Sequence, residues 1–549
     1  MLSTMQDRPL LVSGIFRHGA AVHGRSRIRT FDGERFRDAT FAEVAERTER
    51  LARALQQRLG VTGDDRVATF MWNAQEHVEV YFAAPGIGAV MHTLNLRLPP
   101  EQLVHIANHA EDKVVIAHTT VAPMLAAVAD QLKTVEHVVL VDDGAPVTDE
   151  VRAALAAHLG EVHDYEQLLA SVDGGPFDWP DLDERSAAAM CFTSGTTGDP
   201  KGVVYSHRST WLHSFMVNNS GPITLSERDR ILLIVPQFHV NAWGYPYAAW
   251  MHGTDMIMPS RFLQGPPVAA MIEQAGVTLA AGVPTIWQGL LAHVEANPGV
   301  DLSSVRFLLS GGSALPRVLI ERFGELGVTI LQGWGMTETS PVCAVSAPPA
   351  DADDPLDPMW RLKAGRVVPG VDLRIVTADG AVAPWDGTTE GEIEVRGPWI
   401  TGAYYRVDDP EKFHDGWLRT GDVGTIDDYG FLTITDRVKD VIKSGGEWIS
   451  SVALENEIMG HPDVAEASVV GVSDERWGER PLAVVVRKPG STVTGAELRA
   501  WLEPRVARFW LPERWTFVDE IPKTSVGKFD KKVLRSEEAA GRLEVESAG

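Results

Sequence analysis

The chain has little cysteine, no long apolar run and fewer basic than acidic residues. It contains two cysteines, Cys191 and Cys343, with no CxxC pair or Cys/His cluster, so a zinc site is not expected. So few cysteines fit a reducing compartment, and the N-terminus has no signal-peptide layout, so we expect a cytoplasmic location. No run approaches the roughly 18 apolar residues of a membrane helix, which excludes a transmembrane segment of that kind.

The excess of acidic residues restricts which molecules the protein is expected to bind. With 75 acidic and 50 basic residues, the formal net charge is −25. Such a surface repels nucleic acid, which is therefore not expected as a partner. It also repels polyphosphates, so a site for one must concentrate lysine, arginine and backbone N–H groups locally.

The apolar pattern predicts an α/β fold. A helix is expected at 41–59, and short apolar strands are expected at 67–72, 114–117, 138–141, 231–235, 278–281, 305–309 and 328–331. A further helix is expected at 315–326, with one apolar face made of Leu315, Val318, Leu319, Phe323 and Leu326. Alternation of apolar strands and helices indicates parallel sheets covered on both sides.

The pattern of expected helices and strands changes after about residue 348. Strands expected at 371–376, 391–396 and 430–435 predict a small β-subdomain. Beyond residue 436 a compact α+β unit is expected, with helices at 452–459 and 495–507 and strands at 467–472 and 483–486.

A loop rich in glycine and threonine follows the apolar run 187–192. Residues 193–202 read TSGTTGDPKG, which suits neither helix nor strand. Backbone N–H groups of such a loop can surround an anion, while hydroxyls add donors and Lys201 adds charge. The triphosphatase pattern G-x-x-x-x-G-K-[ST] is absent. These residues predict a phosphate loop at a strand end, with a plain surface turn as the alternative.

The same ten residues resemble the phosphate-loop signature of the adenylate-forming superfamily, which includes acyl-CoA synthetases, luciferases and peptide-synthetase adenylation domains. The resemblance runs from about residue 16 to about residue 535 and is nearest to bacterial medium- and long-chain fatty-acid–CoA ligases. It implies a large domain over 1–435 with the acyl, ATP and Mg²⁺ sites, and a small mobile domain over 436–549. It assigns to ATP the loop residues Thr193, Ser194, Gly195, Thr196, Thr197, Gly198 and Lys201.

A second glycine-rich motif, QGWGMTET, follows the expected strand 328–331. An indole face can stack on a purine and a carboxylate can ligate Mg²⁺, although Trp334 could equally be core and Glu338 a helix cap. The resemblance assigns Trp334 to adenine, and Glu338 with Thr193 to Mg²⁺. Many relatives carry tyrosine at this position, so any hydrogen bond from Trp334 stays open. The further nucleotide contacts that it implies are Gly312, Ser313, Gln332, Gly333 and Thr337.

Two later motifs carry charge. In WLRTGD at 417–422, Asp422 can accept hydrogen bonds from both hydroxyls of a ribose. The alternative is an aspartate that only stabilises a turn, which is common after glycine. Residues 435–440, TDRVKD, are typical of a solvated interdomain linker. The resemblance makes Asp422 a ribose ligand and Asp436 the hinge. It makes Arg437 and Lys439 nucleotide contacts, and it implies a loop that enters for the thiol step, with Lys443, Gly445, Gly446, Glu447 and Trp448.

Three more residues take chemical roles only through the resemblance. Lys528 would otherwise be a solubility residue; the family pattern makes it the catalytic lysine that neutralises charge at the α-phosphorus. His239 would otherwise be a satisfied core histidine; the pattern places it near the acyl carboxylate, so that Lys528, Glu338 and His239 form the catalytic set. Trp243 matches the aromatic gate of the acyl tunnel.

The resemblance therefore implies an ATP-dependent fatty-acid–CoA ligase that works through acyl-AMP. Its substrates would be a medium- to long-chain fatty acid, ATP and coenzyme A, with Mg²⁺ as cofactor and, by analogy, a homodimer as the assembly. Two other ligases stay open: a fatty-acyl-AMP ligase that loads a carrier protein, and a CoA ligase for a short or sulfur-bearing acid. A further alternative is a nucleotide-binding regulator that has lost catalysis. The chain retains Thr193, Lys201, Glu338, Asp422 and Lys528, which opposes this alternative.

Overall fold

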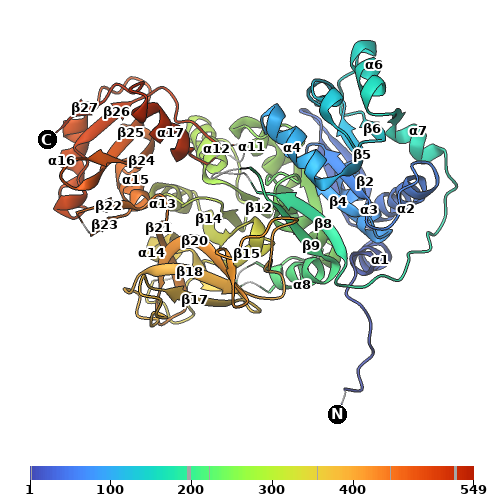
Figure 1. The fold of residues 1–549 in the computed structure, drawn as a ribbon, viewed down its shortest axis with the longest axis horizontal. Coiled ribbons are helices and arrows are strands. Elements are labelled where there is room, and N and C mark those ends of the chain that lie inside the picture. The colour runs from blue at the N-terminus through green and yellow to red at the C-terminus, as the bar shows by residue number, and fades with distance from the viewer. Residues whose placement is uncertain are drawn as a thin grey trace.

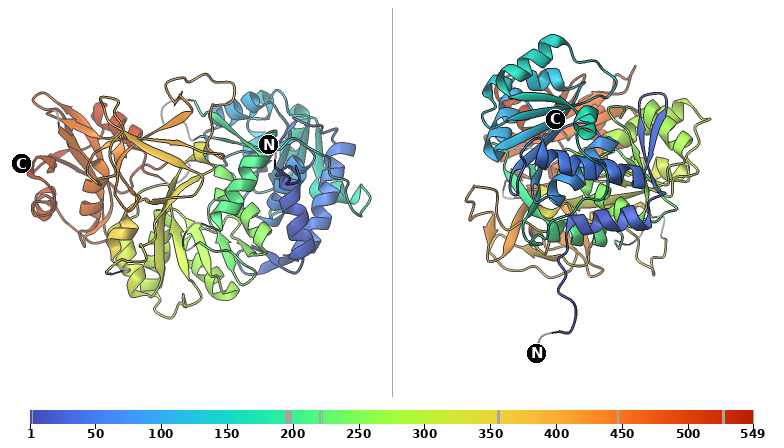
Figure 2. Two further views of the ribbon diagram at one scale, coloured as in Figure 1. Left: turned by 90° about the horizontal axis from the view of Figure 1, so that it is seen from below. Right: turned by 90° about the vertical axis from the view of Figure 1, so that its right-hand side faces the viewer.

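The computed structural model describes residues 1, 3–193, 199–219, 221, 223–354, 357–445, 447–524 and 528–548. The predicted phosphate-loop residues Ser194, Gly195, Thr196, Thr197 and Gly198, and Gly446 of the thiol-step loop, lie outside this part of the chain. Among the described helices, none is both long and apolar enough to cross a bilayer. Figure 1 and the left panel of Figure 2 place the C-terminal unit, in red, at one end of the long axis and the blue N-terminal helices at the other.

Two sheets build the large N-terminal part, as the apolar pattern predicts. The first is parallel except for its last strand and contains, in spatial order, β7 (Glu161–Asp164), β6 (His137–Val141), β5 (Asp112–His118), β3 (Arg66–Phe70), β4 (Val90–Thr93), β8 (Ala187–Phe192) and β9 (Gly202–Ser206). The second begins with parallel strands, namely β14 (Thr329–Gly335), β13 (Phe307–Ser310), β12 (Leu279–Gly282), β10 (Arg230–Leu233), β11 (Asp255–Met258) and β1 (Arg27–Phe31), and ends on antiparallel β2 (Phe36–Thr40).

The predicted β-subdomain continues the second sheet. Strand β14 pairs in parallel with β13 through Gln332 and then, from Gly333, antiparallel with β15. The antiparallel part is β15 (Val342–Val345), β16 (Gly365–Val367), β21 (Phe431–Arg437), β20 (Trp417–Ile426), β18 (Gly391–Arg396) and β17 (Asp372–Val376), with β19 (Phe413–His414) beside β20. The motif around Trp334 therefore lies inside a strand, where the sheet changes from parallel to antiparallel pairing.

Helices cover the two sheets. They are α1 (Val12–Val22), α2 (Phe41–Gln57), α3 (Gln75–Gly86), α4 (Pro100–Ala110), α5 (Ala122–Ala126), α6 (Asp149–His158), α7 (Tyr165–Ala170), α8 (His207–Val217), α9 (Val240–Trp243), α10 (Tyr245–His252), α11 (Gly265–Ala275), α12 (Pro284–Ala296), α13 (Arg317–Glu325) and α14 (Pro358–Leu362). Helix α2 begins at a capping box, because Thr40 and Glu43 satisfy each other's backbone N–H groups. The apolar face predicted for 315–326 is partly wrong: Val318 and Leu326 are exposed, and Ile320 is buried with Leu319 and Phe323.

The C-terminal unit has its own sheet and core. Its strands are β22 (Ile442–Ser444), β23 (Glu447–Ile449), β24 (Val464–Asp474), β25 (Gly478–Arg487), β26 (Arg514–Phe517) and β27 (Glu546–Ser547), and its helices are α15 (Ser451–Met459), α16 (Gly495–Leu502) and α17 (Lys531–Ala539). Trp515 is fully enclosed among Leu498, Leu502 and other apolar side chains. Helix α16 is shorter than predicted because Pro504 has no N–H to donate to the preceding turn.

The segment 435–440 is only in part the solvated linker that its charge predicts, because Val438 and Lys439 are exposed but Asp436 is buried. Strand β21 runs through Arg437, and Asp436 is 1% exposed. The Oδ2 atom of Asp436 accepts hydrogen bonds from the backbone N–H of Ser451 (2.6 Å) and from its hydroxyl (2.7 Å), at the start of α15. Burial raises the pKa of the Asp436 carboxyl despite nearby Lys531. The last strand of the N-terminal part is thus joined to the C-terminal unit through a buried carboxylate.

Candidate functional site

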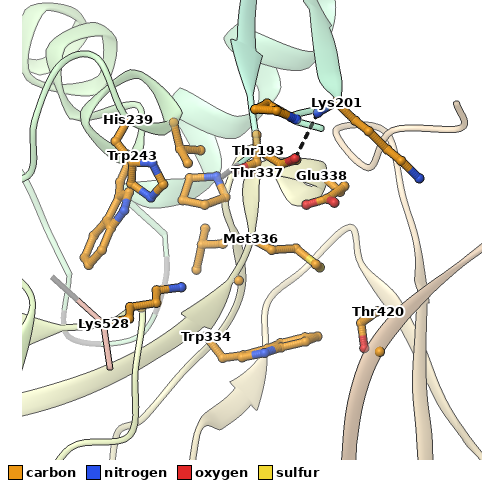
Figure 3. A pocket seen from close by; sticks show the side chains of 18 of the residues that line it. Thr193, Lys201, His239, Trp243, Trp334, Met336, Thr337, Glu338, Thr420 and Lys528 are labelled. Carbon is orange, nitrogen blue, oxygen red and sulfur yellow. Dashed lines mark hydrogen bonds between the residues drawn. The ribbon is translucent and has the colours of Figure 1, made fainter. Parts of the chain in front are cut away.

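A cavity of about 680 Å³ lies between the N-terminal part and the C-terminal loop that holds Lys528. Figure 3 shows side chains from distant segments converging on it. The residues predicted from the sequence that line it are Thr193, Lys201, His239, Trp243, Gly312, Gly333, Trp334, Thr337, Glu338, Arg437, Lys439 and Lys528.

Cationic side chains are concentrated at this cavity, although the chain as a whole is strongly acidic. Those that line it are Lys201, Lys412, Arg437, Lys439 and Lys528. Part of this charge is balanced locally, because Nζ of Lys201 contacts Oδ2 of Asp409 at 2.7 Å. The enclosed surroundings of Lys412 lower the pKa of its ammonium. The cavity therefore has the local positive charge that a polyphosphate requires on so acidic a protein.

Trp334, Asp422 and Arg437 form one hydrogen-bonded group. The indole N–H of Trp334 donates to Oδ2 of Asp422 (2.8 Å), and Nε of Arg437 lies 3.1 Å from Oδ1. Asp422 and Arg437 meet because they are directly opposite each other in the β20–β21 register. A carboxylate has about four acceptor sites, so Asp422 retains the capacity to accept from a vicinal diol. The hydrogen bond left open for Trp334 is therefore made by its indole N–H.

The ends of the predicted phosphate loop are closed by its own backbone. The N–H of Thr193 donates to the carbonyl of Lys201 (2.9 Å), and the N–H of Lys201 donates to the Thr193 hydroxyl (3.1 Å). Strands β8 and β9 are antiparallel neighbours, so they bring the described ends of the loop, Thr193 and Lys201, together at the cavity. The short connection between two hydrogen-bonded strands explains why Thr193 and Lys201 line the same surface.

Glu338 is a buried carboxylate in the cavity wall. It is 6% exposed, and its Oε1 accepts a hydrogen bond from the Tyr404 hydroxyl at 2.6 Å. Figure 3 shows Glu338 and Thr193 at the same end of the cavity, away from Trp334. A carboxylate and a hydroxyl are hard oxygen donors of the kind that Mg²⁺ takes, with water and phosphate oxygens completing its shell. The donor set at this end fits Mg²⁺.

Lys528 reaches into the cavity against a glycine. A Cβ added at Gly312 would lie 3.4 Å from Cε of Lys528, in van der Waals contact, and Gly312 has φ +83°, so a side chain there would strain the backbone. Desolvation in the cavity, followed by the positive charge of Arg437, lowers the pKa of Lys528 to about 8. Figure 3 shows its ammonium group pointing toward the space between Trp334 and His239.

His239 and Trp243 stand at the two ends of a left-handed turn. Val240, Asn241, Ala242 and Trp243 all have φ between +46° and +56°, which is an outlier for a β-branched residue such as valine. The turn is anchored by Asn241, whose Oδ1 accepts from the buried Cys191 thiol at 3.0 Å. Desolvation lowers the pKa of His239 to about 3, so the imidazole is neutral. Strained backbone of this kind persists where a function requires a fixed side-chain direction.

Some predicted site residues lie elsewhere. Ser313 is exposed, and Gln332 supports the wall from behind, with its Oε1 accepting from the Leu315 N–H at 2.8 Å. The described thiol-step residues Lys443, Gly445, Glu447 and Trp448 do not line the cavity; Trp448 lines a separate depression on the β-subdomain. Lys528 and this loop are therefore not at the same site in this arrangement.

The sequence analysis missed several residues of the cavity. Tyr404 holds Glu338, Asp409 holds Lys201, and Lys412 donates to the Thr420 carbonyl at 3.1 Å. All three lie between the motifs at 332–339 and 417–422, in a segment with no glycine-rich signature. Their charge and aromatic character are visible in the sequence, but their partners are more than sixty residues away or, for Lys412, in strand β20.

Comparison with known proteins gives consistent matches along the chain. The family model described as AMP-binding enzyme matches residues 16–405, and the AMP-binding enzyme C-terminal domain matches residues 453–528. A 3-methylmercaptopropionyl-CoA ligase of Ruegeria pomeroyi is 44% identical over 98% of this chain and 99% of its own. A long-chain-fatty-acid–CoA ligase of Thermus thermophilus is 43% identical, and a medium-chain-fatty-acid–CoA ligase of Ectopseudomonas oleovorans is 41% identical, each over 97% of both chains.

Two solved structures agree with these matches. The crystal structure of an anthranilate CoA ligase in complex with anthranoyl-AMP superposes with a TM-score of 0.84 at 25% identity, covering 98% of this chain and 100% of the other. An ATP-bound structure of MatB from Rhodopseudomonas palustris superposes with a TM-score of 0.81 at 25% identity, covering 97% and 100%.

Proposed function

Since this chain belongs to the AMP-binding enzyme family, we propose that it joins an aliphatic monocarboxylic acid to coenzyme A and cleaves ATP to AMP and pyrophosphate. The observation that carries the proposal is one cavity lined by two chemically different sets of side chains. One set is Trp334, which donates to Asp422, and the cationic groups; the other is apolar and comprises Val217, Ile223, Val240, Leu309, Val342 and Val345. A cavity that combines nucleotide-binding groups with apolar side chains suits an acyl chain that must meet an α-phosphate.

The first step is acyl-AMP formation. A carboxylate oxygen attacks the α-phosphorus in line, the bond to the bridging oxygen breaks, and pyrophosphate leaves. Trp334 would face the adenine, Asp422 would accept from the ribose, and Lys528 would neutralise the charge that spreads at phosphorus. Thr193 and Glu338 would hold Mg²⁺, which shields the phosphate charge when bound. Neutral His239 would contact the carboxylate without adding a positive charge.

The second step needs a different set of groups at the same acyl carbon. The CoA sulfur attacks that carbon, the C–S bond forms and AMP leaves. Lys528 lies in the cavity and Trp448 lies outside it, so both cannot act in one arrangement. We therefore propose that the C-terminal unit rotates about Asp436 between the steps, with the domain boundary at 435/436.

The activity is tested by two separate assays on one set of acids from butyrate to stearate. Pyrophosphate release without CoA reports acyl-AMP formation, and CoA-ester formation reports the whole reaction. Acyl-AMP without a CoA ester would favour the carrier-protein ligase. No pyrophosphate release with any acid would contradict the proposed function.

A short sulfur-bearing acid is the second candidate substrate. The 44% identity to a 3-methylmercaptopropionyl-CoA ligase over almost the whole chain favours it. Including 3-(methylthio)propionate in the series compares it directly with the fatty acids.

Acyl-AMP formation is expected to decline above about pH 8. Lys528 acts as the ammonium, so the rate is full below its pKa of about 8 and falls about tenfold per pH unit above it. The measurement is kcat/KM for pyrophosphate release from about pH 6.5 to about pH 10. In Lys528→Arg the guanidinium stays charged, so the alkaline decline should move upward. An unchanged decline in that variant would assign the titration to another group.

Trp243→Ala is expected to shift the preferred acid toward longer chains. Trp243 borders both the main cavity and a small one of about 40 Å³ whose lining includes Ile234 and Leu263, and its indole is the largest side chain that the two cavities share. Removing it joins them, so kcat/KM should gain about fourfold per newly buried methylene. The half-exposed Trp385 offers a control, since Trp385→Ala should leave the chain-length profile unchanged. If the chain-length profile of Trp243→Ala equals that of the wild type, Trp243 is not the gate of the acyl tunnel.

A further inference from the structure

One buried tyrosine hydroxyl has no hydrogen-bond partner in the described part of the chain. Six of the eight tyrosines are buried, and five of these hydroxyls donate a hydrogen bond: Tyr81 to Gln237, Tyr165 to Glu79, Tyr205 to Thr337, Tyr247 to Tyr81 and Tyr404 to Glu338. The sixth is Tyr245, which is 2% exposed and whose hydroxyl has no hydrogen-bond partner among the described residues. Buried hydroxyls in proteins are nearly always paired, so this one requires an explanation.

The Tyr245 side chain borders the main cavity. Tyr245 is one of its lining residues, and its hydroxyl is not among the fully enclosed polar atoms without a partner. Because the residue is otherwise buried, the hydroxyl is reached from the cavity. Burial raises the pKa of Tyr245, so the group is a neutral O–H donor at physiological pH.

No described side chain takes up this donor. The cavity that Tyr245 borders has an apolar share of its lining, including Val217, Ile223, Leu309 and Val345, which offer no side-chain hydrogen-bond acceptor. Tyr245 is the first residue of α10 and follows Gly244, at φ +74°, which ends the left-handed turn that carries Trp243. Because the hydroxyl is held at the start of a buried helix, it can reach a bound acyl chain at one depth of the cavity only. It should therefore select acids whose hydrogen-bond acceptor lies at one position of the chain.

We propose that Tyr245 is a specificity-determining residue that donates a hydrogen bond to an ether oxygen or thioether sulfur within the acyl chain of the acid. This rests on the proposed function and narrows its substrate class from plain alkyl acids to aliphatic acids with one acceptor atom in the chain. An alkyl chain would leave the O–H without a partner, which costs affinity, whereas an acceptor atom satisfies it. Oxygen should benefit more than sulfur, which is the weaker acceptor.

The test compares acids that differ in one atom. Pentanoate, 3-methoxypropionate and 3-(methylthio)propionate place CH₂, O or S at the same position, and hexanoate with 4-methoxybutyrate and 3-ethoxypropionate moves the oxygen along the chain. The readout is the ratio of kcat/KM for each heteroatom acid to that for its alkyl counterpart. At one position this ratio should exceed one in the wild type and fall about tenfold in Tyr245→Phe. The kcat/KM for the alkyl acids should be unchanged or higher.

Tyr247→Phe is the matched control. Tyr247 lies two residues further in α10, donates to the Tyr81 carbonyl at 3.2 Å and does not line the cavity. Its removal should lower the thermal midpoint but leave every heteroatom-to-alkyl ratio unchanged. A ratio that falls equally in both variants would show a structural effect and overturn the proposal.

Three further outcomes distinguish a failure of the Tyr245 proposal from a failure of the proposed function. If the wild type prefers the alkyl acid at every position, the hydroxyl binds only water and the proposal is wrong, whether or not Tyr245→Phe folds. If alkyl acids are activated normally and the ratios stay constant in Tyr245→Phe, the proposed function stands and only this inference fails. If no acid is activated at all, the proposed function itself fails.

Discussion

Lys528→Ala is expected to slow acyl-AMP formation by about 10²- to 10³-fold, while conversion of supplied acyl-AMP to the CoA ester stays within about twofold of wild type. Lys528 is the lysine of the C-terminal loop that enters the cavity, where it packs on Gly312. Its ammonium can stabilise the developing charge at phosphorus, but breaking the mixed anhydride with a thiol needs no group at that place. Pyrophosphate release and CoA-ester formation from purified acyl-AMP, measured separately, check both halves.

The control for this variant is in the same loop. Nζ of Lys523 contacts Oε1 of Glu466 at 2.7 Å, and Lys523 does not line the cavity, so Lys523→Ala removes an equal charge without touching the site. Both half-reactions should be retained. If Lys528→Ala lost the two half-reactions to the same extent, the lysine would be structural and its catalytic assignment would be rejected.

Asp436→Pro is expected to reduce the CoA step by about 100-fold and to leave acyl-AMP formation within a few fold. Proline holds φ near about −65°, so a residue that must change its backbone angles between two arrangements can no longer do so. Asp436 lies one residue before the end of β21, and β16 pairs only with Phe431 and Leu432. The substitution therefore falls near the end of a strand that pairs at this point with β20 but not with β16, where proline disturbs fewer strand contacts than in a central strand.

Asp436→Ala separates backbone rotation from side-chain contact. It removes the carboxylate that accepts from Ser451 but leaves φ free, so the CoA step should be retained at a lower thermal stability. Equal loss of the CoA step in both variants would mean that the carboxylate contact is what matters. The hinge would then have to lie elsewhere in the chain.

The strongest predictions from the sequence were those carried by short contiguous signals. Apolar runs predicted the strands at 114–117, 138–141 and 391–396, and the structure confirms them with ends displaced by at most two residues. The α/β class and the small C-terminal unit are likewise confirmed by the fold and its relatives. These features depend on periodicity over a few residues, which is why a single sequence reveals them.

The errors arose where long-range packing overrides local character. Charge made 435–440 look like a solvated linker, yet pairing with β20 and the contact with Ser451 bury Asp436. Helical spacing put Val318 and Leu326 on an apolar face, but α13 packs through Leu319, Ile320 and Phe323. No local rule reports which neighbour a strand or helix will meet.

The order of residues along the chain was enough to predict the fold class and the family, because each depends on signals in adjacent positions. Folding alone decided that Asp422 is shared by Trp334 and Arg437, that Tyr404 secures Glu338, and that Tyr245 borders the cavity with no partner for its hydroxyl among the described residues. Those contacts join residues far apart in sequence, and their energies depend on distance and desolvation, which exist only once the sheets and the C-terminal unit have packed together.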